Sequence, residues 1–535
     1  MRPVPKASLS PTSAAWWKRG VIYQIYPRSF MDANGDGVGD LAGIIWKLDY
    51  IRALGVDAIW LSPFYPSPMA DFGYDVSDYT GVHPLFGTMR DFGELLAEAH
   101  RRDLKVIIDW VPNHTSDQHA WFAESRSSRT NVKRDWYIWR DGAPDGGPPN
   151  NWTAAFRRAG RAWTFDEATE QWYLHSFLAE QPDLNWDNPE VEAAMHDTLR
   201  FWLDKGVDGF RIDVAHKIGK DPALADNPAD VEEFTALEPM RRHDEDWPST
   251  HERLAAIRRV VEDYPGRMIV GEVYILDLER LMDYVNAPDG LHLSHNFVFL
   301  HQPWDADAFR KLLEDIEELR SPAAWAAWFL NNHDHSRVAT RYGPHAVRAA
   351  AMLVLSLRGT PFLFQGEELG LPDAPVSPEE EVDVDGRDPE RAPIPWEPPS
   401  AAGPGAGFTS GAPWLPITSD AEQLNAATQS EDAGSTLSFY RRLIRLRKEN
   451  ACLQWGSMEL LSSNKDVLGY VREGAEHRMV VVINFSDAPA CFEGALAGLQ
   501  GTAHIALSTD SEAGRDEVDL RAVPLGPGEG LILQL

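Results

Sequence analysis

Short apolar runs alternate with longer amphipathic stretches along most of the chain. Runs that are apolar on both faces are typical of strands buried on both sides, as in a parallel sheet covered by helices. The amphipathic stretches have the spacing of helices that cover such a sheet. Eight runs predict strands, at 21–26, 56–61, 104–109, 207–213, 268–272, 291–297, 326–331 and 361–364. Eight strands separated by helices predict a (β/α)₈ TIM barrel.

Two departures from this alternation divide the chain. The segment after the third strand is polar, rich in Trp, Arg, Gly and Pro, and too long for a linker, which indicates an inserted domain. After a last amphipathic helix, short strand patterns at 458–461, 467–471, 479–485 and 530–533 predict an all-β sandwich at the C-terminus. We therefore predict a barrel domain A at 1–112 and 182–450, an inserted domain B at 113–181 and a C-terminal β-sandwich domain C at 451–535.

Charge and composition narrow the class of partner. The net charge of −32, from 50 basic and 82 acidic residues, disfavours nucleic acid and anionic membranes. We find no signal peptide and no apolar run long enough to span a membrane. The two cysteines, Cys452 and Cys491, have neither the spacing of a metal site nor a disulfide framework. These features predict a cytoplasmic protein.

Acidic residues follow several of the predicted strands. Asp109, Asp213, Glu272 and Asp334 come at the ends of the third, fourth, fifth and seventh strands, where the active sites of (β/α)₈ barrels lie. Arg211 lies two residues before Asp213, so both side chains point to the same face, and the cation favours an ionised Asp213. A strand-end salt bridge would explain this pair alone, but not the other acids.

Two carboxylates that face one scissile bond are typical of a glycosidase. At the retaining separation of about 5 Å, one carboxylate attacks the sugar and the other protonates the leaving oxygen. An ionised Asp213 suits the nucleophile, and Glu272, which has no cation near it in sequence, suits the acid. Asp334, flanked by two histidines, could stabilise the developing positive charge.

Ordered motifs along the chain resemble glycoside hydrolase family 13, the α-amylase family, and within it the α-glucosidase and oligo-1,6-glucosidase group. The matching segments are 109–114, 181–185, 209–213, 271–272, 332–334 and 359–368. The resemblance implies that Asp213 is the nucleophile, Glu272 the general acid/base and Asp334 the stabiliser of the transition state.

The resemblance also implies a glucose subsite that is closed at one end. His114, Arg211 and His333 would bind ring hydroxyls, and Tyr74 would stack on the ring. Asp71 and Arg391 would hold the non-reducing end, which makes the enzyme exo-acting. A structural role is the alternative for Asp109 and for Arg387.

An acidic loop near the N-terminus has oxygen ligands at alternate positions, as in loops that wrap a hard cation. A metal-free acidic turn explains the sequence about equally well, and the twelfth position is glycine rather than the glutamate of an EF-hand. Similar loops in the resembled subgroup bind Ca²⁺ or Mg²⁺, so we predict a structural cation. Its ligands would be Asp32, Asn34, Asp36, the carbonyl of Val38, and Asp40.

The residues after the nucleophile depart from the family pattern. Many members have a histidine four residues after the nucleophile, where this chain has Lys217, and His216 comes one position earlier. Val214 follows the nucleophile directly, and in the resembled subgroup valine there tends to accompany activity on α-1,6 bonds. Substrate preference is therefore open.

The sequence predicts a retaining exo-α-glucosidase that hydrolyses short α-glucosides through a covalent glucosyl-enzyme, with some transglucosylation. The alternative is a glucosyl transferase or isomerase of the same family, such as a sucrose isomerase, a trehalose synthase or a transglucosidase. A non-catalytic barrel of the kind found in transporter heavy chains is disfavoured, because all three acids are present and no membrane anchor is found. The partner would be a small α-glucoside or oligosaccharide, bound by a monomer or a homodimer.

Overall fold

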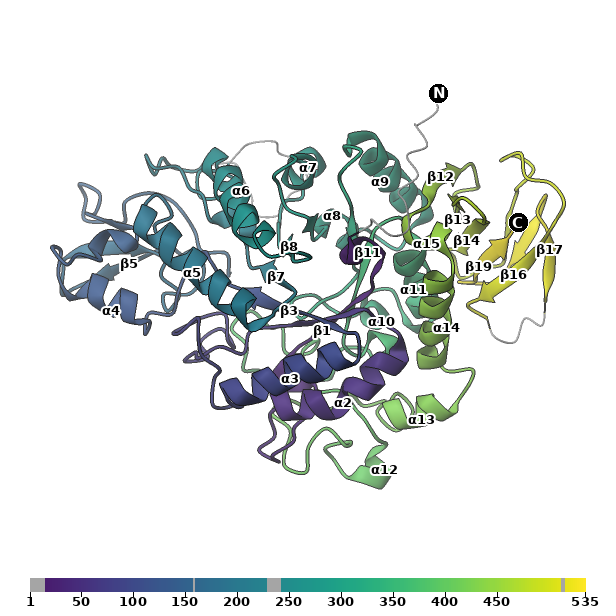
Figure 1. The fold of residues 1–535 in the computed structure, drawn as a ribbon, viewed down its shortest axis with the longest axis horizontal. Coiled ribbons are helices and arrows are strands. Elements are labelled where there is room, and N and C mark those ends of the chain that lie inside the picture. Colours follow the sequence, from purple (N-terminus) through teal and green to yellow (C-terminus); the bar gives the residue numbers. More distant parts are fainter. Residues whose placement is uncertain (1–14, 157–158, 229–241, 511–514) are drawn as a thin grey trace.

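A computed structural model describes residues 15–156, 159–228, 242–510 and 515–535. Eight parallel strands form a barrel at the centre of the molecule, which confirms the predicted fold (Figure 1). They are β1 (Ile22–Ile25), β2 (Ala58–Leu61), β3 (Lys105–Trp110), β7 (Gly209–Ile212), β8 (Met268–Gly271), β9 (Leu293–Ser294), β10 (Ala327–Trp328) and β11 (Thr360–Phe364).

The order of these strands around the barrel is β10-β11-β1-β2-β3-β7-β8-β9. A parallel bridge between His295 and Ala327 joins the two ends of this sheet. Val106, Ile107 and Ile108 on β3 are all 0% exposed. Alternate side chains of a strand point to opposite faces, so both faces of β3 are covered, which explains its continuous apolar pattern.

Helices surround the barrel. Capping residues in the sequence mark where several of them begin and end. The side chain of Asp40 accepts a hydrogen bond at the start of α2, and α2 ends at Gly55 with a φ of 97°. Thr88 and Asp91 form a capping box at the start of α3. The long helices are α2 (Leu41–Leu54), α3 (Met89–Arg101), α5 (Pro189–Lys205), α6 (Pro248–Glu262), α7 (Leu278–Asn286), α9 (Ala306–Leu319), α11 (Val347–Ser356) and α14 (Thr436–Glu449).

Two barrel strands are shorter than predicted. The sixth run, 291–297, gives only β9, because the chain turns into the short helix α8 (Phe297–Leu300). The seventh run, 326–331, gives only β10. Phe329 and Leu330 are buried, so their apolar character reports burial and not strand pairing. Shorter helices elsewhere are α1 (Trp16–Arg19), α4 (Ala120–Ser127), α10 (Val338–Arg341), α12 (Pro399–Ala402), α13 (Ala426–Glu431) and α15 (Ala451–Trp455).

The segment after β3 folds beside the barrel as an inserted unit, at the left of Figure 1. It contains α4 and an antiparallel sheet in the order β4-β6-β5, made of β4 (Trp139–Arg140), β5 (Trp163–Asp166) and β6 (Gln171–Leu174). The positions at which we divide the chain into domains stay predictions.

The C-terminal segment forms two antiparallel sheets around its own core, at the right of Figure 1. Val480, Phe492, Val523 and Leu531 contribute to that core. The larger sheet has the order β12-β13-β14-β19-β16-β17, and β15 pairs with β18. These strands are β12 (Ser457–Leu461), β13 (Val467–Glu473), β14 (Arg478–Asn484), β15 (Ala490–Phe492), β16 (Thr502–Ser508), β17 (Glu517–Asp519), β18 (Val523–Leu525) and β19 (Gly530–Gln534). Within the described residues, no helix is long and apolar enough to cross a membrane.

Candidate active site

The predicted acids meet at the carboxyl ends of the barrel strands. Asp213 directly follows β7 and Glu272 directly follows β8, while Asp109 is the next-to-last residue of β3. Asp334 lies in the loop after β10. Because β3, β7 and β8 are adjacent in the sheet, their terminal side chains lie side by side.

One guanidinium contacts three of these acids. Arg211 Nη1 lies 2.6 Å from Asp213 Oδ1 and 2.8 Å from Asp109 Oδ1, and its Nη2 lies 2.6 Å from Glu272 Oε2. The contact between Arg211 and Asp213 is the predicted one. Glu272 has no cation near it in the sequence, but the fold brings Arg211 to it from the neighbouring strand.

Burial opposes ionisation of this cluster. Asp213 is 5% exposed, and burial raises its pKa well above the usual value although Arg211 opposes the rise. Burial also raises the pKa of Asp109 to about 6, again against Arg211. Three carboxylates with one guanidinium carry a net negative charge, which favours the retention of a proton. The sequence argument considered only Arg211 and missed burial, which outweighs it.

Val214, the residue after Asp213, has a strained backbone. Its φ of 35° lies in the left-handed region, which a β-branched residue rarely adopts and which costs about 1–3 kcal/mol. This conformation accompanies a hydrogen bond in which the Val214 N–H donates to Glu272 Oε2 at 3.0 Å. The strained residue therefore links the backbone just after Asp213 to the carboxylate of Glu272.

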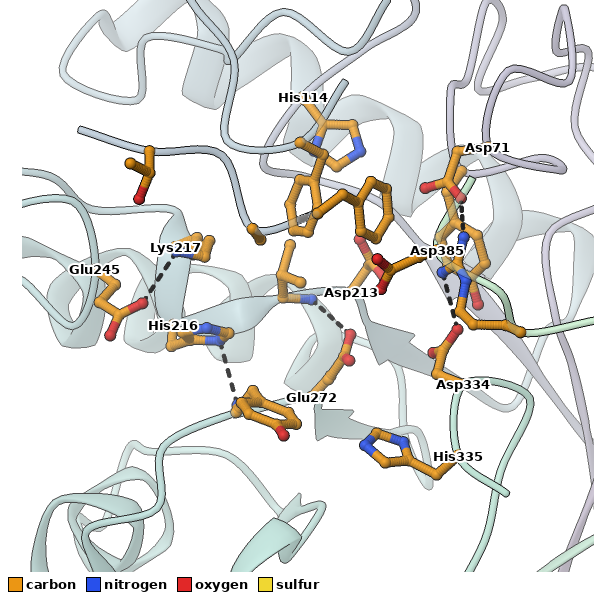
Figure 2. Close-up of a pocket in the computed structure, with 18 of the residues that line it drawn as sticks. Asp71, His114, Asp213, His216, Lys217, Glu245, Glu272, Asp334, His335 and Asp385 are labelled. Carbon is orange, nitrogen blue, oxygen red and sulfur yellow. Dashed lines mark hydrogen bonds and ion pairs between the residues drawn. The ribbon is translucent and has the colours of Figure 1, made fainter. Parts of the chain in front are cut away.

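One end of the site is closed by two acids that share an arginine (Figure 2). Arg387 Nη2 lies 2.7 Å from Asp71 Oδ1, and its Nη1 lies 3.1 Å from Asp334 Oδ1. Arg387 lines the pocket, whereas Arg391 is 0% exposed and donates to the backbone oxygen of His333 and to Asp334 from behind. Arg387 therefore faces the pocket, where the resemblance had implied Arg391, and the contacts of either arginine with a substrate stay predictions.

The charge of Asp334 is stabilised by its surroundings. Burial alone would raise its pKa, but His333, Arg387 and Arg391 more than offset this and hold the pKa of Asp334 well below its usual value. Burial also lowers the pKa of His333 well below its usual value, so this ring is neutral at pH 7. The two arginines therefore supply the permanent positive charge beside Asp334.

Tyr74 is backed by the buried ring of His333. Their rings stack at 5.4 Å with an interplanar angle of 4°, and the Tyr74 hydroxyl lies 2.6 Å from His333 Nε2. Tyr74 and His114 line the pocket. Arg211 and His333 are at most 1% exposed, so in this structure they support the pocket walls from behind.

The pocket has a volume of about 260 Å³. In Figure 2, Asp213 and Glu272 lie between Asp71 on one side and the Lys217–Glu245 pair on the other. Lys217, which stands where many family members have a histidine, lies with its Nζ 3.0 Å from Glu245 Oε2. The two residues form an ion pair in the pocket wall.

Sequence reasoning missed several residues of this wall. Phe156 and Phe177 pack with Val214 and come from the inserted domain, and Glu245 and Tyr274 come from loops after β7 and β8. Only the position of Tyr274, two residues after Glu272 in the sequence, could have indicated one of them.

The predicted metal loop has oxygen donors that suit a hard cation, but its carboxylates also serve the loop itself. Both oxygens of Asp32 accept backbone N–H groups of the loop, at 2.7 to 2.9 Å. Asn34 and Asp36 each accept one more, and Asp40 caps α2. In the part of the chain that the structure describes, no three His, Cys, Asp or Glu side chains are grouped to hold a metal ion. The cation stays a prediction.

Comparison with known proteins supports the same family. The family described as "Alpha amylase, catalytic domain" matches residues 24–456. A probable alpha-glucosidase of Rhizobium meliloti (strain 1021) is 42% identical over 517 residues, which cover 91% of this chain and 92% of that protein. An oligo-1,6-glucosidase of Parageobacillus thermoglucosidasius is 38% identical over 525 residues, covering 89% of this chain and 92% of that protein.

Solved structures of an alpha-glucosyl transfer enzyme and of a trehalulose synthase are also similar. The alpha-glucosyl transfer enzyme XgtA is 40% identical with a TM-score of 0.89, covering 98% of this chain and 100% of that chain. The trehalulose synthase MutB from Pseudomonas mesoacidophila MX-45 is 34% identical with a TM-score of 0.90, with the same coverage. Together with the fold and the clustered acids, these matches show that the chain belongs to glycoside hydrolase family 13, the α-amylase family, and is a glycoside hydrolase of its α-glucosidase and oligo-1,6-glucosidase group.

Proposed function

We propose that this protein is a retaining exo-α-glucosidase that hydrolyses terminal α-glucosidic bonds of short α-glucosides. One observation carries the proposal: Asp213 and Glu272 contact the two terminal nitrogens of one guanidinium, in a pocket closed at one end by Asp71 and Arg387. Two carboxylates on one planar fork lie close together, which favours the retaining separation of about 5 Å over the inverting one of about 6.5–9.5 Å.

In the first step, Asp213 attacks C1 of the glucose while Glu272 gives its proton to the leaving oxygen. The bond from C1 to that oxygen breaks, and a covalent glucosyl-enzyme forms. In the second step, Glu272 takes a proton from water, the water oxygen attacks C1, and Asp213 leaves. The first step needs one proton on the pair, which matches the tendency of the buried cluster to retain one. That proton leaves with the aglycone oxygen, so Glu272 is free to take a proton from water in the second step.

The closed end would hold the terminal glucose. Asp334, kept ionised by two arginines, would stabilise the positive charge that develops on the ring. Asp71 and Arg387 would bind the outer hydroxyls, Tyr74 would stack on the ring, and His114 would bond a ring hydroxyl. Because a chain cannot extend past Asp71 and Arg387, only a terminal unit fits.

The test is a set of initial rates on maltose, isomaltose, sucrose, trehalose and maltotriose, with Asp213→Asn as the inactive reference. We expect release of glucose with retained anomeric configuration by the wild type and none by the variant. Glucose released with inverted configuration, or by the variant at the wild-type rate, would rule out the mechanism.

A second candidate is transfer of glucose to a sugar or an alcohol. The similarity to the alpha-glucosyl transfer enzyme and to the trehalulose synthase supports it, as does the polar wall formed by His216, Lys217 and Glu245 beside the leaving-group side. A sugar bound there would compete with water for the glucosyl-enzyme. Product analysis at high substrate concentration separates the two, since transfer yields isomers or longer glucosides and hydrolysis yields free glucose.

We further propose that the loop with Asp32, Asn34, Asp36, Val38 and Asp40 holds a structural Ca²⁺ or Mg²⁺. The all-oxygen donor set supports this. When bound, the cation would neutralise the acids of the loop that begins α2 and take no part in the chemistry at Asp213.

A further inference from the structure

The amide of Asn113 is held between two charged groups directly behind the pocket. Lys220 Nζ donates to Asn113 Oδ1 at 2.8 Å, and Asn113 Nδ2 donates to Asp183 Oδ1 at 3.2 Å. A flipped amide would place its NH₂ group against an ammonium and its oxygen against a carboxylate, so the observed orientation is fixed. Burial alone would raise the pKa of Asp183, but the charge of Lys220 and a hydrogen bond from Ser176 lower it, so this carboxylate is ionised.

The same NH₂ group faces the ring of His114. Asn113 Nδ2 lies 3.1 Å from His114 Nδ1. On the other side of the ring, Gln181 Nε2 lies 3.1 Å from His114 Nε2. The amide of Gln181 is also oriented, because its oxygen accepts from the Leu178 N–H and its nitrogen donates to Asp71 Oδ2 at 3.0 Å. Two amide donors therefore face one imidazole.

A neutral imidazole has one acceptor nitrogen, so it accepts a hydrogen bond from only one of these amides. His114 is 1% exposed, and burial lowers its pKa to about 4, so the ring is neutral at pH 7. Asn113 is oriented by two full charges. Gln181 is oriented by one charge, that of Asp71, and by the neutral N–H of Leu178. The balance favours acceptance at Nδ1.

We propose that Asn113, oriented by Lys220 and Asp183, is a positioning residue that holds His114 as the Nε2–H tautomer. The Nε2–H group then lies on the Asp71 side of the ring, where it donates to a hydroxyl of the terminal glucose. The role of that donor rests on the proposed function, whereas the tautomer itself does not.

The experiment is ¹⁵N NMR of the full-length protein labelled at histidine, at pH 7 without substrate, with the His114 signals assigned from a His114→Gln variant. We expect the wild type to show a protonated Nε2 and an unprotonated Nδ1. Asn113→Ala removes the amide that donates to Nδ1. Gln181 is then the amide that donates to the ring, at Nε2, and the ring proton moves to Nδ1. Gln181→Leu, the matched control, removes the competing donor and leaves the proton on Nε2.

A wild-type spectrum with the proton on Nδ1 would overturn the proposal even if no variant folded. An unchanged tautomer in folded Asn113→Ala would overturn it as well, because a purely structural Asn113 would not affect the position of the proton. We also expect kcat/KM for p-nitrophenyl α-glucoside to fall about tenfold in Asn113→Ala, the value of one hydrogen bond. Absence of activity in the wild type would refute the proposed function and leave the tautomer result standing.

Discussion

Replacing Arg387 with methionine tests whether this arginine sets the charge of Asp71. The two side chains are 10% and 5% exposed and lie 2.7 Å apart, so little solvent screens their interaction. Burial raises the pKa of Asp71 to about 6, and Arg387 is the largest opposing influence. Without Arg387, the carboxylate loses its closest cation while it stays buried.

The size of the effect follows from the bond that is lost. A hydrogen bond to a charged group contributes about 1.5–3 kcal/mol, and a change of one pH unit in pKa corresponds to about 1.4 kcal/mol. The pKa of Asp71 should therefore rise by about one to two pH units in Arg387→Met. If Asp71 binds glucose as a carboxylate, activity is lost as the pH falls through its pKa, and this loss should begin at a higher pH in the variant.

The assay is the pH dependence of kcat/KM for p-nitrophenyl α-glucoside in the wild type, Arg387→Met and Arg387→Lys. Lysine keeps the charge but not the fork, so its acid limb should move less than that of the methionine variant. Burial also raises the pKa of Asp109 to about 6, but its guanidinium contact is with Arg211. An acid limb that stays in place in Arg387→Met would refute the reasoning and point to Asp109 or the catalytic pair instead.

Four further outcomes are expected. Asp213→Asn should reduce turnover at least about 10⁴-fold with an unchanged circular dichroism spectrum, and near-normal rates would exclude it as the nucleophile. Val214→Thr should change the ratio of the rates on isomaltose and maltose, since Val214 lines the pocket. A ratio unchanged from the wild type would exclude Val214 as a determinant of linkage preference. Asp208→Asn should cost about 3 kcal/mol of unfolding free energy at pH 7, because buried Asp208 contacts His100, Lys105 and Arg267. These contacts outweigh burial and lower the pKa of Asp208. The wild type should therefore be more stable than the variant above about pH 4, and this difference in unfolding free energy should vanish as the pH falls below that value. A difference that urea unfolding shows to be independent of pH would contradict this. Removal of divalent cations with EDTA should lower the melting temperature of the wild type but not of Asp36→Asn. Equal changes in melting temperature in the two proteins would contradict cation binding by the loop that contains Asp36.

The sequence alone was sufficient for the barrel and for the location of the acids. Parallel strands covered on both faces leave a continuous apolar pattern, and strand ends are where barrel active sites lie, so Asp213 and Glu272 could be identified without coordinates. β15, β16, β17 and β18 were not predicted, because each is short or carries exposed residues that weaken the strand pattern.

Tertiary structure alone decided which charges meet. Arg211 is two residues from Asp213 but 61 from Glu272, and its contact with both follows from the pairing of β7 with β8. The choice of Arg387 over Arg391 as the pocket residue depends on which of two guanidiniums faces the cavity. Strand periodicity and local spacing are encoded within a few residues, whereas burial and the orientation of a long side chain depend on segments far apart in the chain. For that reason the sequence identified the acids, and only the fold showed how their charges are balanced.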